Sequence, residues 1–193
     1  MVQENMEATG LGELIQGCVK GERYSQSRLY ELLASKMFMV CQRYARNREE
    51  AEEVLQEGFM RVFDHIQQYK FTGSFEGWVR KIMVNCALSK YRSKSQLHAV
   101  VNIDPGSPNL EYAGTEEILS RLSVKELVKL IQQLPPAYRM VFNLYVFEGM
   151  KHREIAGQLN ISEGTSKSNL SDARAILQRN ITSSLQAAKQ NVK

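Results

Sequence analysis

The stretch 163–177, EGTSKSNLSDARAIL, carries short polar and basic side chains at the spacing of one helix face. Such side chains donate hydrogen bonds and carry positive charge, which suits contacts with DNA bases and phosphates. The residues concerned are Thr165, Lys167, Ser168, Asn169, Ser171 and Arg174. The other face has small or apolar residues at i, i+4, i+7 and i+11, namely Ser166, Leu170, Ala173 and Leu177. A slim polar face backed by an apolar one predicts a helix that lies in a DNA major groove.

The residues before this helix predict a short turn and an earlier helix. Ile155, Ala156 and Leu159 form an apolar face, and Asn160 tolerates the left-handed conformation of a helix end. Ser162 suits the N-cap of the following helix. The pattern indicates a helix-turn-helix, and a helical hairpin with a solvated outer face is the alternative. The scarcity of Glu on the outer face and the shortness of the turn favour the helix-turn-helix.

Charge is unevenly distributed along the chain, whose formal net charge is +4. The segment 48–57, REEAEEVLQE, is strongly acidic. The segment 80–92, RKIMVNCALSKYR, has basic residues and no acidic one. Polarity of this kind suggests different partners for two faces. Two solvated helix faces would explain the charges more simply, so charge alone does not decide.

The spacing of apolar residues predicts the helices that position these side chains, and Gly and Pro mark where the helices end. Helical spacing covers most of the chain but is interrupted at 70–78, KFTGSFEGW. It is lost around NIDPGSPNLEYAG (102–114), whose Pro and Gly content is typical of a linker. The expected fold is all-α, with helical domains at 10–92 and 116–185 joined by a flexible linker at 93–115.

Composition argues against several classes of protein. The chain has 193 residues, of which 24% are charged and 43% hydrophobic, as in ordinary globular domains. No apolar run approaches the ~20 residues of a membrane span, and we expect no secretory signal. The three cysteines are far apart and no CxxC motif occurs. We therefore expect reduced thiols in the cytoplasm rather than disulfides or a zinc site.

The sequence has no motif that indicates an enzyme. It contains no phosphate-binding glycine loop, no metal-ligand cluster and no nucleophile motif. We therefore expect no catalytic residue, no metal and no cofactor. His152, beside Arg153, is expected to be a surface residue.

Two segments together resemble a known family. The segment LPPAYRMVFNLYVFEGMKHREIAGQLNISEGTSKSNLSDARAIL (134–177) is similar to region 4, the −35-binding domain, of bacterial sigma factors of the extracytoplasmic-function group. The segment EEAEEVLQEGFMRVFDHIQQYKFTGSFEGWVRKIMVNCALSKYR (49–92) is similar to their region 2. A helix-turn-helix alone occurs in other regulators, but the pair of motifs in this order and with this spacing is specific.

The resemblance implies a sigma factor that binds core RNA polymerase and directs it to promoters by reading −10 and −35 elements. The implied partners are the β′ clamp helices and the β flap of the polymerase, and promoter DNA. Members of the family are usually held inactive by an anti-sigma factor that is often membrane-bound. The chain itself is expected to stay in the cytoplasm and not to insert into the membrane.

The resemblance also assigns residues of region 2. The implied polymerase contacts are Glu50, Glu53, Gln56, Glu57 and Phe59. The implied contacts with single-stranded −10 DNA are Tyr69, Lys70, Phe71, Lys81, Asn85, Lys90 and Arg92. Physical reasoning agrees, because three of the glutamates share a helix face, and aromatic rings stack on unpaired bases. Trp78 is expected to belong to the core rather than to the contact surface.

In region 4, the family's pattern places Lys167, Ser168, Asn169 and Ser171 at bases and phosphates, and Thr165 and Arg174 at the DNA backbone. The chain departs from this pattern at three positions. Lys151 stands where Ser or Thr usually caps the first helix, Ser166 replaces a buried aliphatic residue, and Asp172 replaces a basic one. Ser166 is expected to weaken packing, and Asp172 either points away from DNA or changes promoter choice.

Two other classes of function remain open at this point. A stand-alone helix-turn-helix regulator would bind duplex DNA without being a polymerase subunit, with 48–92 as a sensor or dimerisation domain. A helical interaction adapter would leave the basic face solvated. Binding to core polymerase distinguishes the sigma factor from both, and salt-dependent duplex binding distinguishes the regulator from the adapter.

Overall fold

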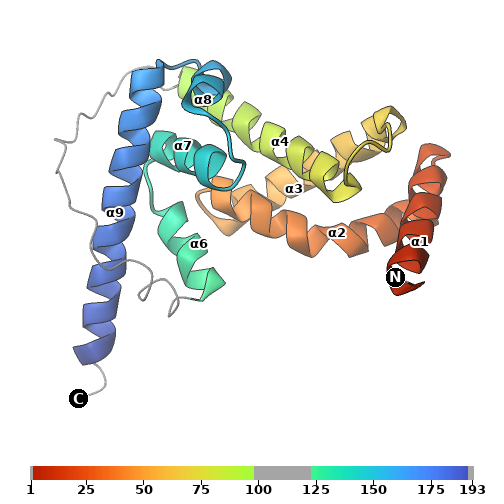
Figure 1. Ribbon diagram of the computed structural model, residues 1–193, viewed down its shortest axis with the longest axis horizontal. Coiled ribbons are helices and arrows are strands. Elements are labelled where there is room, and N and C mark those ends of the chain that lie inside the picture. The colour runs from red at the N-terminus through yellow and green to blue at the C-terminus, as the bar shows by residue number, and fades with distance from the viewer. Residues whose placement is uncertain (1, 98–122, 191–193) are drawn as a thin grey trace. The chain divides into compact units, whose positions relative to one another are not determined.

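The computed structural model describes residues 2–97 and 123–190, with side chains described for 10–93 and 123–183. Within these ranges the chain forms helices and connecting turns, without strands (Figure 1). This confirms the all-α fold. No helix in the described part is long and apolar enough to cross a membrane.

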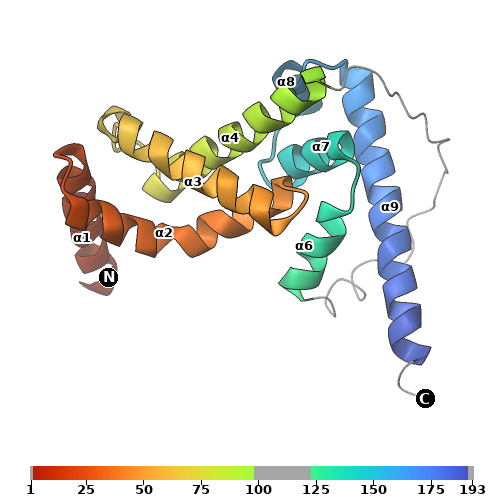
Figure 2. The same cartoon turned by 180° about the vertical axis from the view of Figure 1, so that it is seen from behind.

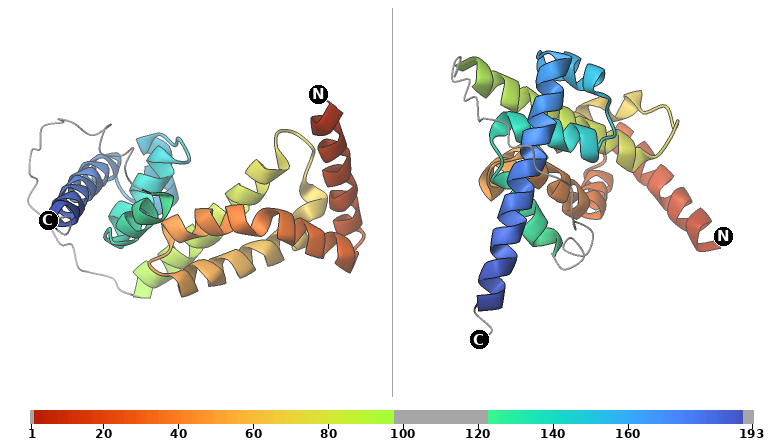
Figure 3. Two further views of the ribbon diagram at one scale, coloured as in Figure 1. Left: turned by 90° about the horizontal axis from the view of Figure 1, so that it is seen from below. Right: turned by 60° about the vertical axis from the view of Figure 1, so that its left-hand side comes forward.

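The chain divides into two compact units, Met1–Ser89 and Lys90–Lys193. The helices that begin in the first unit are α1 (Val2–Val19), α2 (Arg23–Tyr44), α3 (Arg48–His65), the 3-10 helix η1 (Ile66–Gln68) and α4 (Phe75–Leu97), and the last residues of α4 extend past the boundary. α2 and α3 pack along each other, and α4 crosses this pair (Figures 1 and 3). Asn47 caps α3, because its side-chain oxygen accepts a hydrogen bond from the Glu50 amide at 2.9 Å.

A continuous apolar core holds the first unit together. Its fully buried side chains include Leu29, Met37, Val54, Val62, Val79, Met83 and Leu88. Gly58 leaves room for the Met83 side chain of α4 against α3, because a Cβ atom at position 58 would lie 2.1 Å from the Met83 sulfur. On the surface, Lys36 of α2 and Glu76 of α4 form an ion pair at 2.8 Å. Each large apolar side chain contributes roughly 1.5–3 kcal/mol when fully buried, so this core is the main source of stability.

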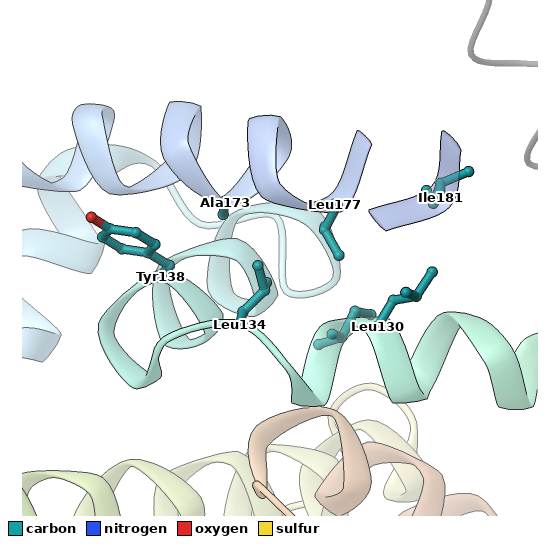
Figure 4. Close-up of a cluster of buried hydrophobic side chains, with 7 residues drawn as sticks. Leu130, Leu134, Tyr138, Ala173, Leu177 and Ile181 are labelled. Atoms are coloured by element: carbon teal, nitrogen blue, oxygen red, sulfur yellow. The ribbon is translucent and has the colours of Figure 1, made fainter. Parts of the chain in front are cut away.

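The helices of the second unit are α6 (Val124–Gln132), α7 (Pro136–Val146), α8 (His152–Leu159) and α9 (Glu163–Gln190). α6 and α7 lie against α9 (Figure 2). Figure 4 shows Leu130, Leu134 and Tyr138 facing Ala173, Leu177 and Ile181 of α9. Ser123 and Glu126 form a capping box at the start of α6, and Pro136 occupies the first turn of α7, where a missing N–H costs little.

The described helices test only part of the expected domain limits. α4 continues to Leu97, so the first five residues of the expected linker, 93–97, are helical. The rest of that linker, 98–115, lies outside the described residues. The same is true of 116–122, with which the second domain was expected to begin.

Candidate DNA-binding and docking surfaces

The turn between α8 and α9 is short and closed by local hydrogen bonds. Asn160 ends α8 with φ 55° and ψ 49°, the left-handed conformation expected for it. The Ile161 amide donates to the Ala156 carbonyl at 3.1 Å. Ser162 begins the next helix, because its Oγ accepts a hydrogen bond from the Thr165 amide at 2.9 Å. These contacts fix the direction in which α9 leaves the turn, and the segment forms the helix-turn-helix predicted from its sequence.

The outer face of α9 carries most of the predicted DNA contacts. Thr165, Lys167, Ser168, Ser171 and Arg174 are exposed, and Lys167 pairs with Glu163 on the same face at 2.9 Å. The hydrogen bond from Lys167, together with its charge, lowers the pKa of the Glu163 carboxyl below its usual value. The exposed residues offer the hydroxyl and cationic donors that bases and phosphates accept.

Asn169 is not on this outer face. Its residue is only 9% exposed, because it lies next to the buried row formed by Ser166, Leu170 and Ala173. The sequence-based assignment of Asn169 to the DNA-facing side was therefore wrong about its exposure. We do not include Asn169 in the DNA-facing surface, which we define as Thr165, Lys167, Ser168, Ser171 and Arg174.

The inner face of α9 includes a polar contact with α8. Ser166 is fully buried, and its Oγ lies 3.0 Å from Nδ1 of His152. The His152 ring stacks on Tyr145 of α7, with ring centroids 4.8 Å apart and planes 26° apart. His152 is therefore half-buried and bonded, which corrects the expectation of a simple surface residue.

Of the other two departures from the family's pattern, only Lys151 has a local explanation. Lys151 is the N-cap of α8 without offering a side-chain acceptor, but the Glu154 carboxylate accepts a hydrogen bond from the Lys151 amide at 2.7 Å. Asp172 is half-buried at the edge of α9. Near it, the Arg174 guanidinium lies 5.6 Å from the centroid of the Tyr145 ring, within cation–π range.

A tight aromatic loop precedes α4. Tyr69 is buried, and its hydroxyl donates a hydrogen bond to the Gly73 carbonyl at 2.8 Å, which closes the loop. Tyr69 also contacts Phe75 and Trp78, with ring centroids 5.0 and 5.7 Å away. Trp78 is half-buried, so its ring belongs in part to the core, as expected. Tyr69 thus supports the loop from within, and its hydroxyl is engaged by the loop itself.

Phe71 is the exposed aromatic ring of this loop. Its side chain is packed against Tyr69 at 5.0 Å between centroids, yet the residue is 57% exposed. Its φ of 55° is unusual for a residue with a large side chain, since the left-handed region crowds the Cβ atom. Lys70 beside it is also exposed. The loop therefore presents one ring face and one cation.

The helix α4, which follows this loop, carries an exposed polar stripe. Lys81, Asn85 and Arg92 are exposed and lie at i, i+4 and i+11, which places them on one side of the helix. Lys90 is half-buried beside the stripe. Cations and an amide along a helix next to an exposed aromatic ring are what a single nucleic-acid strand requires, because phosphates need charge and bases need stacking surface.

The acidic helix α3 presents a different stripe from the one expected. Glu50 is mostly buried, with 14% of its side chain exposed, and it accepts a hydrogen bond from the Arg46 amide at 2.8 Å. Phe59 is only 3% exposed, and its ring packs against Tyr30 of α2 at 4.6 Å. Neither side chain lies open on the surface, so both positions differ from the sequence-based expectation. Their role is to hold α3 in place.

The exposed stripe of α3 consists of Glu49, Glu53, Gln56 and Met60, at i, i+4, i+7 and i+11. We call these four residues the acidic face. Glu57 lies at its edge and pairs with Arg61 at 2.5 Å. Met60, 67% exposed, was missed by sequence reasoning, although its spacing of seven from Glu53 was a usable signal. An exposed Met among acidic residues supplies an adaptable apolar contact beside the charges.

The His, Cys, Asp and Glu residues of the described part bear on two kinds of chemistry, metal binding and thiol reactivity. None of their His, Cys, Asp and Glu side chains group in threes that could hold a metal ion. Cys18, Cys41 and Cys86 are buried free thiols. Burial raises the pKa of Cys18 to about 11 and that of Cys41 to about 12, so the thiols are poor nucleophiles.

Two family models match the chain in the order of these surfaces. The model "Sigma-70 region 2" matches residues 29–96, which contain the acidic face, the aromatic loop and the α4 stripe. The model "Sigma-70, region 4" matches residues 125–177, which contain the helix-turn-helix. The chain belongs to the extracytoplasmic-function group of sigma-70 factors. Sigma factors of this family direct RNA polymerase to promoters.

Curated relatives of this sigma factor carry names of the same group. The ECF RNA polymerase sigma factor SigE of Mycolicibacterium smegmatis is 31% identical over 144 residues, which cover 73% of this chain and 55% of that protein. SigW of Bacillus subtilis is 28% identical over 171 residues, which cover 84% and 91%. The chain thus spans about half of the first relative's length and nearly all of the second.

A solved structure is also similar to this sigma factor. It is the co-crystal structure of RpoE with the anti-sigma factor NepR from Bartonella quintana. The TM-score is 0.47 at 18% sequence identity, with 79% of this chain and 94% of that chain covered.

Proposed function

We propose that this sigma factor binds core RNA polymerase through region 2 and reads the −35 element through region 4. The observation that carries the proposal is the co-occurrence of both region models in order, each on a surface of matching chemistry. We infer that the alternatives, a stand-alone regulator and an interaction adapter, do not explain the region 2 match. The chain acts by binding, and the proposal requires no catalytic step.

The −35 contacts of the proposal lie on the DNA-facing surface of α9. Lys167 follows the Ser162 cap by five residues, so it enters the major groove with the first turns of the helix. A lysine at this position contacts O6 or N7 of guanine. Arg174 lies two turns farther along and contacts the flanking phosphates, where its stacking on Tyr145 restricts its side chain.

The −10 contacts of the proposal lie on the aromatic loop and α4. Phe71 stacks on an unpaired base, and Lys70, Lys81 and Arg92 neutralise phosphates along the strand. Asn85 offers both a donor and an acceptor to a base edge. Tyr69 acts indirectly in this proposal, since its buried ring and its bond to Gly73 hold the loop that carries Phe71.

The polymerase contacts of the proposal lie on the acidic face. Glu49 and Glu53 attract basic side chains of the β′ clamp helices, and Met60 adds an apolar contact at the same face. The β flap is the further polymerase element that we propose as a partner of region 4. We also propose an anti-sigma factor, often membrane-bound in this group, as the partner that holds the free protein inactive.

The test is transcription by core polymerase with the full chain on a library of promoters. A double variant, Glu53→Lys with Met60→Ala, should weaken binding to core polymerase while its −35 duplex binding stays unchanged. Glu31→Lys is the matched control, because Glu31 is an exposed, Arg28-paired glutamate on α2. If the chain binds −35 duplex but neither binds core polymerase nor supports transcription, the stand-alone regulator replaces this proposal.

A further inference from the structure

His152 joins three helices of region 4. It belongs to α8, stacks on Tyr145 of α7 at 4.8 Å, and shares a hydrogen bond of 3.0 Å with Ser166 of α9. Ser166 lies in the first turn of the helix that carries the DNA-facing surface. The ring therefore connects the start of that helix to the rest of the unit.

The contact has an energetic reason to persist. The Ser166 hydroxyl is fully buried, and a buried hydroxyl without a partner costs about 1–3 kcal/mol. His152 supplies the partner, and the stacked Tyr145 ring holds the imidazole in the orientation that aims Nδ1 at Ser166. The side chain thus links the start of α8 to the first turn of α9.

Charged groups of both signs lie around the ring. On α8, Lys151 and Arg153 flank it in sequence, and the Glu154 carboxylate is occupied by the Lys151 amide. On α9, Glu163 interacts electrostatically with both His152 and Arg153 while it pairs with Lys167. The Arg174 guanidinium stands over the Tyr145 ring on which His152 stacks. Glu148 lies in the segment that leads from α7 to α8.

We propose that His152 is a proton-sensitive determinant of −35 binding, which positions the reading helix through Ser166 and, when protonated, adds a positive charge beside the DNA-facing surface. The inference rests on the proposed −35 function of α9. The phosphates of bound DNA favour the imidazolium form over the neutral form, so binding takes up a proton. Affinity for DNA is therefore expected to rise as the pH is lowered from 8 to 5.5.

The hydrogen bond to Ser166 is compatible with both charge states. In the neutral ring, Nδ1 either accepts from the Ser166 hydroxyl or donates to it, according to the tautomer. In the charged ring, Nδ1–H donates to the Ser166 oxygen, so the contact between the two atoms is kept. Protonation thus changes the charge at this place without breaking the contact that positions α9.

The experiment measures binding of the full chain to −35 duplex between pH 5.5 and 8 at several salt concentrations. Neutralising one further phosphate should raise the affinity for the duplex roughly fivefold near 0.15 M salt. At the acidic end of the pH range, the slope of log affinity against log salt concentration should become steeper by about one. His152→Gln keeps a hydrogen-bonding side chain but cannot titrate, so its affinity should be nearly independent of pH. His65→Gln is the matched control, since His65 is an exposed histidine of region 2.

Each outcome decides between the possibilities. If the affinity of the unchanged chain does not vary with pH, the proton-sensitive role is overturned. The same holds if the His152→Gln variant keeps the full pH dependence. A separate variant, Ser166→Ala, removes the positioning contact but keeps the titrating ring; unchanged affinity and unchanged base preference in this variant would overturn the positioning role. Failure of the unchanged chain to bind any −35 duplex at any pH would instead refute the proposed function itself.

Discussion

Lys167 Nζ lies 2.9 Å from Glu163 Oε1, one helical turn away on the exposed side of α9. The cation that we propose as the main base contact is therefore already paired in the free protein. Because both side chains are well exposed, the pair contributes little to stability. We expect its effect on DNA binding, since in our proposal Lys167 exchanges one anionic partner for another when the helix enters the groove.

Glu163→Gln should raise the affinity for −35 duplex, because it frees Lys167 and removes a negative charge near the phosphates. We expect an increase of roughly fivefold near 0.15 M salt. Fluorescence anisotropy with labelled duplex measures it. Glu52→Gln is the control, since Glu52 pairs with Arg48 at 2.7 Å in the same i, i+4 geometry but in region 2. Equal effects of both substitutions would contradict the local explanation.

The substitutions Lys167→Ala and Arg174→Ala should weaken DNA binding in two different ways. Loss of a base contact relaxes the preference at one or two −35 positions by about 1–3 kcal/mol, which is expected for Lys167→Ala. Loss of a phosphate contact weakens all sequences alike and lowers the salt slope by about one, which is expected for Arg174→Ala. Binding to single-base variants at several salt concentrations separates the two. A uniform loss in both variants would mean that DNA shape, not direct contact, gives the specificity.

Phe71→Gly should make the protein more stable and yet a poorer −10 binder. Glycine adopts the left-handed conformation of position 71 without the cost of about 1–3 kcal/mol that a bulky residue pays. Loss of the ring removes a stacking contact worth about 1–3 kcal/mol per base. Chemical denaturation and binding to a single-stranded −10 oligonucleotide measure the two effects.

Phe71→Ala is the matched control for this pair of effects. Alanine lacks the ring but keeps the backbone strain, so its oligonucleotide binding should fall as in Phe71→Gly without the gain in stability. Duplex −35 binding should be unchanged in both variants. If Phe71→Ala binds the −10 oligonucleotide normally, the exposed ring is not a base contact.

The native protein should resist alkylation at pH 8. Burial raises the pKa of Cys18 to about 11 and that of Cys41 to about 12, and it raises the pKa of Cys86 as well. The reactive thiolates therefore appear only as the pH rises toward these values, well above the usual 8.5 of a free cysteine. Mass spectrometry after iodoacetamide treatment should find three modified cysteines in guanidinium and almost none in the native protein. Fast native labelling at Cys41 would show that its helix opens.

Much of the fold could be predicted because local signals agreed with one another. Asn160 and Ser162 mark the turn of the helix-turn-helix through their own conformational and capping preferences, which depend on few distant contacts. The buried row of Ser166, Leu170, Ala173 and Leu177 followed from helical spacing alone. These features lie within one or two turns of helix, where sequence spacing determines which side chains share a face.

Tertiary contacts explain what the sequence could not show. Phe59 was assigned to the polymerase contacts, but Tyr30 of another helix covers its ring. His152 was expected at the surface, and only the approach of α7 and α9 encloses it. Asn169 is a different case, because its spacing of three from Ser166 and four from Ala173 already indicated the edge of the buried row.

The packing of the Met83 side chain at Gly58 supports two proposed surfaces at once. The surface proposed to meet the enzyme and the surface proposed to meet the opened promoter are built on these two helices, and the Met83 side chain occupies the space that a Cβ at position 58 would need. A methyl group there would require the Met83 side chain to move. Such a change would disturb the packing beneath both proposed surfaces at once, although residue 58 belongs to neither surface.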